Sequence, residues 1–240
     1  MIYIAILMTA FMISKLSLDV HQINYIKNLS ISEEEMDRLN VDQNFIDKSN
    51  SYGLHKLYLS TVSTLITLTF VFFVLLLDGF NKMNFFSEYL GLSVIGTNLA
   101  TIIIFYISFS IINAPLSYLK TFYIEEKFGF NRMTKELFVK DTLKTTALSL
   151  IIISIIFKLF EILFTTYTEF WWFYLWIMFI LLNLVIAYVY PSLIAPIFNK
   201  FERLNDDSLN SSIYALTDKL NFPINDLYVM DGSKRSSHSN

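Results

Sequence analysis

The 240-residue sequence contains no cysteine and only three histidines, six glycines and four prolines. Without cysteine, the chain cannot form disulfides, thiolate zinc sites or a cysteine nucleophile. The low glycine and proline content excludes collagen-like repeats and low-complexity linkers. Lysine and arginine (18) are slightly outnumbered by aspartate and glutamate (21). No overall basic field attracts nucleic acid, and we expect no nucleic-acid partner.

Charged residues are scarce as well. They make up 16% of the chain against 54% hydrophobic residues, whereas a soluble domain usually carries about 25% charge. Residues 57–77, 89–119 and 170–199 contain no charged side chain at all. Because about 20 apolar helical residues cross the ~30 Å hydrocarbon core of a bilayer, these runs predict a polytopic membrane protein.

The hydrophobic pattern predicts about five transmembrane helices and a polar tail. The expected spans lie near residues 2–18, 57–77, 90–112, 145–164 and 173–195. The fold class expected is therefore an all-α polytopic membrane protein with a short cytoplasmic α+β tail. Residues 1–200 would form the membrane domain, and residues 201–240 would begin a second domain. Lys15, inside the first span, is expected to extend its amine toward the membrane surface.

The distribution of basic residues predicts the orientation. Sixteen of the 18 lysines and arginines lie at or beyond the ends of spans on one side, Lys82 lies on the other side, and Lys158 lies inside a span. Since cytoplasmic loops carry the excess of basic residues, we expect an N-terminus outside and a cytoplasmic tail.

Short polar motifs predict where helices begin and end. Ser32 with Glu35 three residues later is a capping-box pattern. Gly129 suits a left-handed helix end, and Thr134 suits the cap of the next helix. In the tail, Asp206 or Asp207 is the expected N-cap of a further helix.

The end of the sequence predicts a β-hairpin. Residues 227–230 read as a short strand, and Asp231-Gly232 is a typical hairpin-turn pair. Residues 233–240 would then be the returning strand.

Few polar side chains are candidates for chemistry. His21, His55 and His238 are not spaced to place two ligands on one helix face for a metal. Lys158 and Glu161 are three residues apart and can pair on one face of a helix. Such an intramembrane polar pair is either structural or part of a polar chamber or transport path.

Adjacent acidic residues and clustered tryptophans have simple explanations. Glu125-Glu126 is expected in a solvated loop, because neighbouring residues diverge on a helix. Trp171, Trp172 and Trp176 are expected to form an aromatic belt at the membrane surface.

Three segments resemble a known family. The segments are Tyr190–Phe201 (YPSLIAPIFNKF), Leu227–Asn240 (LYVMDGSKRSSHSN) and Glu125–Arg132 (EEKFGFNR). They are similar to the type I CAAX prenyl proteases, which are membrane-embedded zinc metallopeptidases. Phe128 and the Trp171-Trp172 pair resemble the bacterial members, which implies a bacterial inner membrane with the peptidase side cytoplasmic.

The resemblance implies zinc-dependent hydrolysis of peptide bonds in prenylated or membrane-associated proteins. In that family the zinc ligands and the general base come from an HExxH helix and a further glutamate. The 240 residues contain no such motif. We therefore expect the chain to be an N-terminal portion that ends before the motif and has no metal ligands or catalytic residues of its own. It would be inactive alone.

The resemblance also implies substrate contacts in the tail. His238 and Asn240 match the start of an edge strand on which the peptide is expected to lie. The expected partners are membrane lipid and a peptide or membrane-protein substrate. The sequence does not indicate an oligomeric state.

Two other functions fit the composition. A transporter or channel would use polar residues within the spans as its path; the candidates are Lys158, Glu161, Asn98, Asn113 and Asn183. A non-catalytic membrane scaffold is the second alternative.

Overall fold

The computed structural model describes residues 2–167 and 169–238. The chain divides into two compact units, residues 1–131 and residues 132–240.

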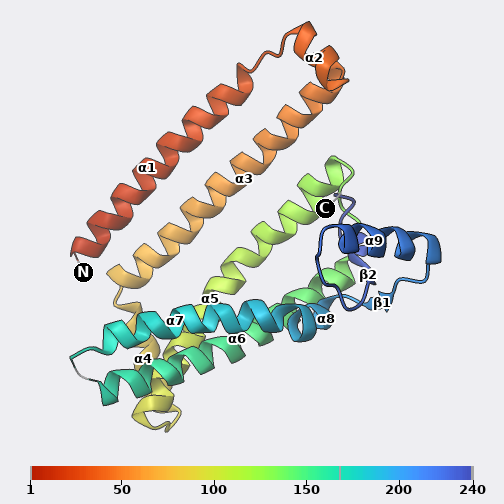
Figure 1. The fold of residues 1–240 in the computed structure, drawn as a ribbon. Helices are drawn as coiled ribbons and strands as arrows, with labels where there is room; N and C mark the ends of the chain where they lie inside the picture. Colours follow the sequence, from red (N-terminus) through yellow and green to blue (C-terminus); the bar gives the residue numbers. More distant parts are fainter. Residues whose placement is uncertain (1, 168, 239–240) are drawn as a thin grey trace. The chain divides into compact units, whose positions relative to one another are not determined.

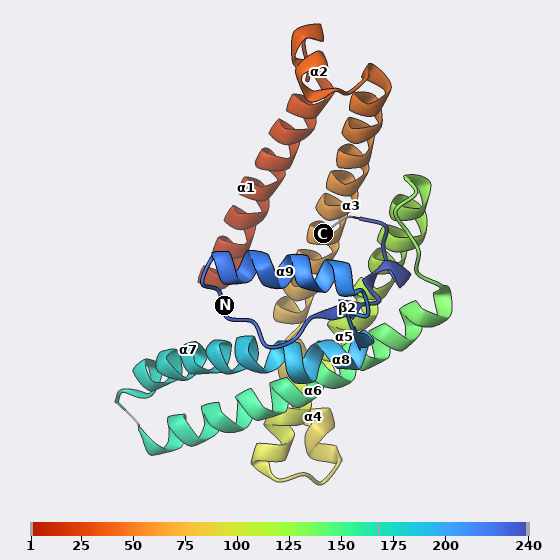
Figure 2. The ribbon, with the colours of Figure 1, turned by 45° about the vertical axis from the view of Figure 1, so that its right-hand side comes forward.

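The first unit is a set of long helices that reverse direction at each connection (Figure 1). Helix α1 (Ile2–Lys27) runs beside α3 (Gln43–Leu76), and the short α2 (Glu33–Leu39) lies in the connection between them. Helix α5 (Val94–Leu119) also packs against α3 and continues as a π-helical turn, η1 (Lys120–Glu125). Figure 2 shows the α1–α3 pair from a second direction.

The helix ends follow the predicted caps. The hydroxyl of Ser32 accepts from the amide of Glu35, whose carboxylate accepts from the Ser32 amide in return, so the capping box is confirmed. Gly129 has a φ of +82°, as expected for a left-handed helix end. Thr134 accepts from the amide of Leu137 and caps the following helix.

The segment before α5 differs from the prediction. Residues 78–89 connect two of the expected spans, and the hydrophobic pattern predicts no helix there, but they form helix α4 (Gly79–Tyr89), which packs on α5. Ser87 is completely buried in this contact, and the Thr101 hydroxyl donates to the side-chain oxygen of Asn84 over 3.3 Å. Small and polar side chains let the two helices approach closely, which a scan for apolar runs does not detect. The helix expected from residue 90 consequently begins at Val94.

The second unit begins with two paired helices, α6 (Lys135–Thr166) and α7 (Trp171–Val189) (Figures 1 and 2). Helix α7 continues through a π-helical turn, η2 (Tyr190–Ile194), into the short α8 (Ala195–Phe198). Pro191 and Pro196 lie in this stretch, where each removes a backbone donor that a regular helix would use.

The tail contains two strands and a helix. Strand β1 (Phe201–Arg203) pairs antiparallel with β2 (Tyr228–Met230), and α9 (Asp207–Lys219) lies between them in sequence. Asp206 is the N-cap of α9, because its carboxylate accepts from the Leu209 amide over 2.9 Å.

The predicted hairpin at the end of the sequence is wrong. A single 3₁₀ turn, η3 (Gly232–Lys234), follows β2, and no strand is formed by the described residues after it up to His238 apart from one bridge residue. The partner of β2 is instead β1, with Phe201 opposite Met230. The hydroxyl-rich sequence after Arg235 offers no apolar alternation that would hold a strand there.

Four helical stretches within the described residues are long and apolar enough to cross a membrane: 43–76, 94–125, 135–166 and 171–198. At most 11% of the most apolar window of each is buried inside the protein. Helices this apolar and this exposed require lipid around them, because exposing such large apolar surfaces to water is unfavourable. The polytopic membrane class is thus confirmed. The expected first span, residues 2–18, lies in α1, which is not among these four, and the exact span bounds stay a prediction.

Candidate functional site

A buried polar link joins α1 to α3. Lys15 forms an ion pair with Asp19 one turn later on α1, and Asp19 is only 3% exposed. The hydroxyl of Thr61 on α3 donates to the same carboxylate over 2.7 Å. Lys15 was expected to reach for the membrane surface, but its charge is neutralised within the first unit.

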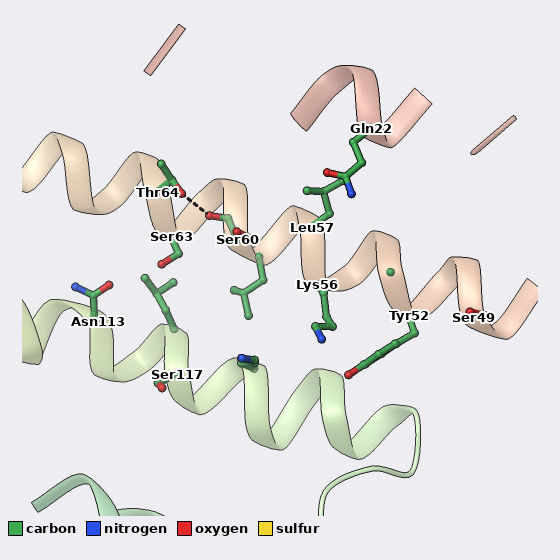
Figure 3. Close-up of a pocket in the computed structure, with 14 residues that line it drawn as sticks. Gln22, Ser49, Tyr52, Lys56, Leu57, Ser60, Ser63, Thr64, Asn113 and Ser117 are labelled. Carbon is green, nitrogen blue, oxygen red and sulfur yellow. Dashed lines mark hydrogen bonds between the residues drawn. The ribbon is translucent and has the colours of Figure 1, made fainter. Parts of the chain in front are cut away.

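A polar groove lies between α1, α3 and α5 in the first unit (Figure 3). Its volume is about 740 Å³. The lining residues are Gln22, Ser49, Tyr52, Gly53, Lys56, Leu57, Leu59, Ser60, Ser63, Thr64, Asn113, Leu116, Ser117 and Lys120. Figure 3 shows Ser63, Lys56 and Tyr52 pointing from α3 toward α5.

The groove has an unusual charge distribution. Two lysines, Lys56 and Lys120, line it, and no acidic residue does. Within the described residues, neither lysine has a carboxylate within ion-pair distance; Lys56 lies instead over the ring of Tyr52 at 4.9 Å. The groove is therefore a positively charged, hydroxyl-lined recess in a membrane protein.

Tyr52 also contacts the loop that follows η1 and holds it in place. Its hydroxyl donates to both carboxylate oxygens of Glu125, at 2.9 and 3.0 Å. Its ring packs against Phe128 and Phe130, with centroid distances of 5.2 and 5.0 Å. Glu125 was expected to be solvated, but it is half-buried in this arrangement, which we term the Tyr52 cluster (Tyr52, Glu125, Phe128 and Phe130).

His55 makes two polar contacts within the first unit. Its Nδ1 lies 2.7 Å from the Ser51 carbonyl and its Nε2 lies 2.9 Å from the Lys127 amine. The carbonyl can only accept, so Nδ1 carries the hydrogen and Nε2 accepts from Lys127. The ring edge of His55 also contacts Phe128.

Arg235 holds the tail in the second unit. Its guanidinium makes a two-point contact with Asp141 on α6, at 2.7 and 3.3 Å. It also donates to the side-chain oxygen of Asn199 over 2.7 Å and to the Phe198 carbonyl. Arg235 and Asp141 are only 21% and 15% exposed. These residues (Arg235, Asp141, Asn199 and Phe198) form the Arg235 cluster, which sequence reasoning did not find.

Asp231 makes a second connection within the tail. Its carboxylate accepts from the Lys200 amide over 2.8 Å, and its own amide donates to the Lys200 carbonyl. Lys234 reaches the other carboxylate oxygen at 2.7 Å. The hydrogen bond from Lys234, followed by that from Lys200, lowers the pKa of Asp231 below its usual value. The segments 190–201 and 227–238, which resemble the same family, are thus bonded to each other.

The expected substrate residues lie at the end of this tail. His238 is exposed, and its amide donates to the Ser236 hydroxyl over 3.1 Å. Asn240 lies outside the described residues. A substrate role for either residue stays a prediction.

The intramembrane pair is formed on α6. The amine of Lys158 lies 3.0 Å from the Glu161 carboxylate, with 61% and 19% of the two side chains exposed. Two of the three asparagines of the transporter hypothesis bond within their own units, Asn113 to Thr67 and Asn183 to the Phe179 carbonyl.

No group of three histidine, cysteine, aspartate or glutamate side chains within the described residues could hold a metal ion. The expected zinc therefore finds no fitting ligand set in this part of the chain.

Comparisons with known proteins agree on one family. The family model described as "CAAX prenyl protease N-terminal, five membrane helices" matches residues 22–200. The chain is 33% identical to a probable CAAX prenyl protease 1 of Schizosaccharomyces pombe over 83% of this chain and 45% of that relative. It is 33% identical to a homologue from Taenia solium, over 93% of this chain and 50% of the relative.

A solved structure agrees as well. The crystal structure of S. mikatae Ste24p superimposes with a TM-score of 0.88 at 29% identity, covering 98% of this chain and 57% of the other. The chain thus spans about half the length of the curated relatives it matches.

Proposed function

The chain belongs to the CAAX prenyl protease N-terminal family, and on this premise we propose that it forms the membrane part of a zinc metalloendopeptidase. Such an enzyme would cleave peptide bonds in prenylated or other membrane-associated proteins. The observation that carries the proposal is the match to Ste24p, which extends over 98% of the chain.

The role we propose for this chain is to hold the tail and to orient the substrate, because the HExxH motif of the family is not among its 240 residues. The zinc would be bound by residues outside this sequence and would supply Lewis-acid activation of water. The Arg235 cluster supports a positioning role for this chain, because it binds the tail to α6 and to the end of α8.

The tail is the proposed substrate side. His238, directly after the segment that Arg235 fixes, would contact the peptide together with Asn240. A peptide bound as an added strand would use backbone hydrogen bonds, which tolerate many sequences. Membrane lipid and a peptide or membrane-protein substrate are the proposed partners.

The family assignment favours the peptidase over the transporter and scaffold hypotheses. In the peptidase, Lys158 and Glu161 would face a polar interior rather than lipid, because charges in membrane helices avoid hydrocarbon.

We propose an outside N-terminus and a cytoplasmic tail on the charge bias. The bacterial inner membrane is proposed on Phe128 and the Trp171-Trp172 pair, although the two curated relatives compared above are eukaryotic. Because the chain has no cysteine, single cysteines report the orientation. Tyr89→Cys, at a position 85% exposed, should label from outside intact cells, and Ser211→Cys should not; the reverse labelling would overturn the orientation.

The enzymatic proposal is tested by zinc content and cleavage. The 240-residue chain and a longer reading frame that contains it are purified, and cleavage of a prenylated CAAX peptide is measured with each. We expect bound zinc and chelator-sensitive cleavage only with the longer protein. Zinc-dependent cleavage by the 240-residue chain, or a longer protein without an HExxH helix, would contradict the proposal.

A further inference from the structure

The groove between α1, α3 and α5 offers several hydrogen-bond donors that bind nothing in the described structure. The side chains of Gln22, Ser49, Ser63 and Ser117 have no hydrogen-bond partner within the described residues. Gln22, Ser49 and Ser117 are exposed and Ser63 is half-buried, so these polar groups are accessible to a ligand that enters the groove. A recess in which they gather is suited to a ligand with several acceptor oxygens.

The charge of the groove selects an anion. Lys56 and Lys120 both line the groove. Two carboxylates of the same unit have other partners: Asp19 binds Lys15 and Thr61. Glu125 accepts from the Tyr52 hydroxyl. The two lysines are therefore not neutralised by acidic side chains. A phosphate, with its negative charge and its oxygens, complements this combination of amines and hydroxyls.

The position of the groove selects a lipid rather than a soluble anion. Lys56 directly precedes the uncharged run 57–77, and Lys120 directly follows the uncharged run 89–119. Both lysines therefore lie at the same end of the spans, and the charge bias makes this the cytoplasmic end. Anionic lipids are concentrated at that surface. Leu57, Leu59 and Leu116, which also line the groove, offer apolar contacts for an acyl chain.

We propose that this groove is a binding site for an anionic phospholipid, with its phosphate held between Lys56 and Lys120 and the serine hydroxyls. Lipid binding at this groove is measured independently of the proposed enzymatic function.

The test measures lipid retention by native mass spectrometry. The 240-residue chain in detergent is titrated with phosphatidylglycerol or with phosphatidylcholine. The variant Lys56→Gln/Lys120→Gln is compared with Lys27→Gln/Lys48→Gln, which removes the same charge from lysines that do not line the groove. We expect phosphatidylglycerol to bind the groove variant about thirtyfold more weakly, from ~1 kcal/mol per lysine. The control variant should bind like the wild type.

A second variant tests the space without altering charge. Ser63→Leu places an apolar side chain in the groove and should weaken phosphatidylglycerol binding, with phosphatidylcholine retention as the internal measure of intact folding. Equal loss in both lysine variants would show a general charge effect and overturn the site. So would equal retention of the two lipids, or displacement of phosphatidylglycerol by inorganic phosphate at equal concentration.

Discussion

The two units use different interactions to hold the segments that follow their membrane helices: the loop after η1 in the first unit and the tail in the second. In the first unit the Tyr52 cluster uses one neutral hydroxyl on a carboxylate, surrounded by aromatic rings. In the second unit the Arg235 cluster uses a guanidinium that binds a carboxylate, a side-chain amide and a backbone carbonyl. Removing a hydroxyl leaves packed rings in place, whereas removing the guanidinium leaves a carboxylate without its countercharge.

This difference implies that a single substitution can destabilise the tail of the second unit more than the loop of the first unit. Arg235 alone makes four hydrogen bonds to Asp141, Asn199 and Phe198, whereas β1 and β2 contain only three residues each. Two strands this short do not form an independently stable sheet. The tail therefore depends on Arg235 more than the first-unit loop depends on Tyr52.

Arg235→Ala should have the largest effect. It leaves the Asp141 carboxylate without its partner and should lower the free energy of local opening of the tail by about 3 kcal/mol. This value is at the lower end for a buried ion pair, because both residues are partly exposed. Hydrogen exchange of amides 228–235 in the detergent-solubilised chain measures this. The matched control is Arg203→Ala, whose guanidinium is 76% exposed and lies 3.4 Å from Asp226. Equal effects of the two changes would contradict the comparison.

Replacing Glu161 should have the next largest effect. The Lys158–Glu161 pair lies within one helix, so it shows the cost of an unpaired charge where no separate segments are joined. Glu161→Leu leaves Lys158 unpaired in an apolar helix, at a cost of on the order of 2–3 kcal/mol. The double change to Leu should restore most of the lost stability, as measured by thermal unfolding in nanodiscs. If the single and double variants unfold alike, the two residues do not interact.

Tyr52→Phe should have a smaller effect, because the aromatic contacts persist. Losing the hydroxyl donated to Glu125 should cost about 1.5 kcal/mol, typical of a hydrogen bond to a charged group. The readout is exchange of amides 128–131, where the Phe130 and Asn131 amides donate to the Glu125 carbonyl. Tyr58→Phe, also on α3 and 43% exposed, is the control. A loss as large as that of Arg235→Ala would remove the difference between the units.

Acid should have the smallest effect, confined to the tail. Since the pKa of Asp231 is lower when folded than when unfolded, its contribution is complete above the unfolded pKa of about 4 and is lost as pH falls through the folded pKa. Exchange protection of the Asp231 amide, corrected for the intrinsic rate, should begin to fall as the pH drops below about 5 and should keep falling through the folded pKa. Asp231→Asn should abolish that fall, and an unchanged fall in this variant would exclude Asp231 as its source.

Local and compositional signals predicted much of the fold correctly. The apolar runs give the membrane helices, and Ser32, Thr134 and Asp206 cap helices because capping depends on three or four neighbouring residues. Helix α4 was missed because its sequence contains no long apolar run; its contact with α5 combines small and polar side chains with the Phe80–Phe105 ring pair.

Long-range partners could not be predicted from the sequence. Strand β2 pairs with a strand that ends 25 residues before it, and Arg235 binds Asp141, 94 positions earlier. The Asp231-Gly232 pair by itself does not distinguish a hairpin from a 3₁₀ turn, because both use the same turn residues. The groove was also missed, since its lysines lie 64 positions apart on two helices.

The central claim, that this chain is the membrane part of a CAAX-type protease, is tested most directly by a chimera. Residues 1–240 replace the matching part of S. mikatae Ste24p, with which they share a TM-score of 0.88, and zinc-dependent cleavage of a prenylated CAAX peptide is measured. The account predicts cleavage that a chelator abolishes and that Arg235→Ala strongly reduces. A chimera that inserts into membranes and binds zinc, yet cleaves no peptide, would contradict it.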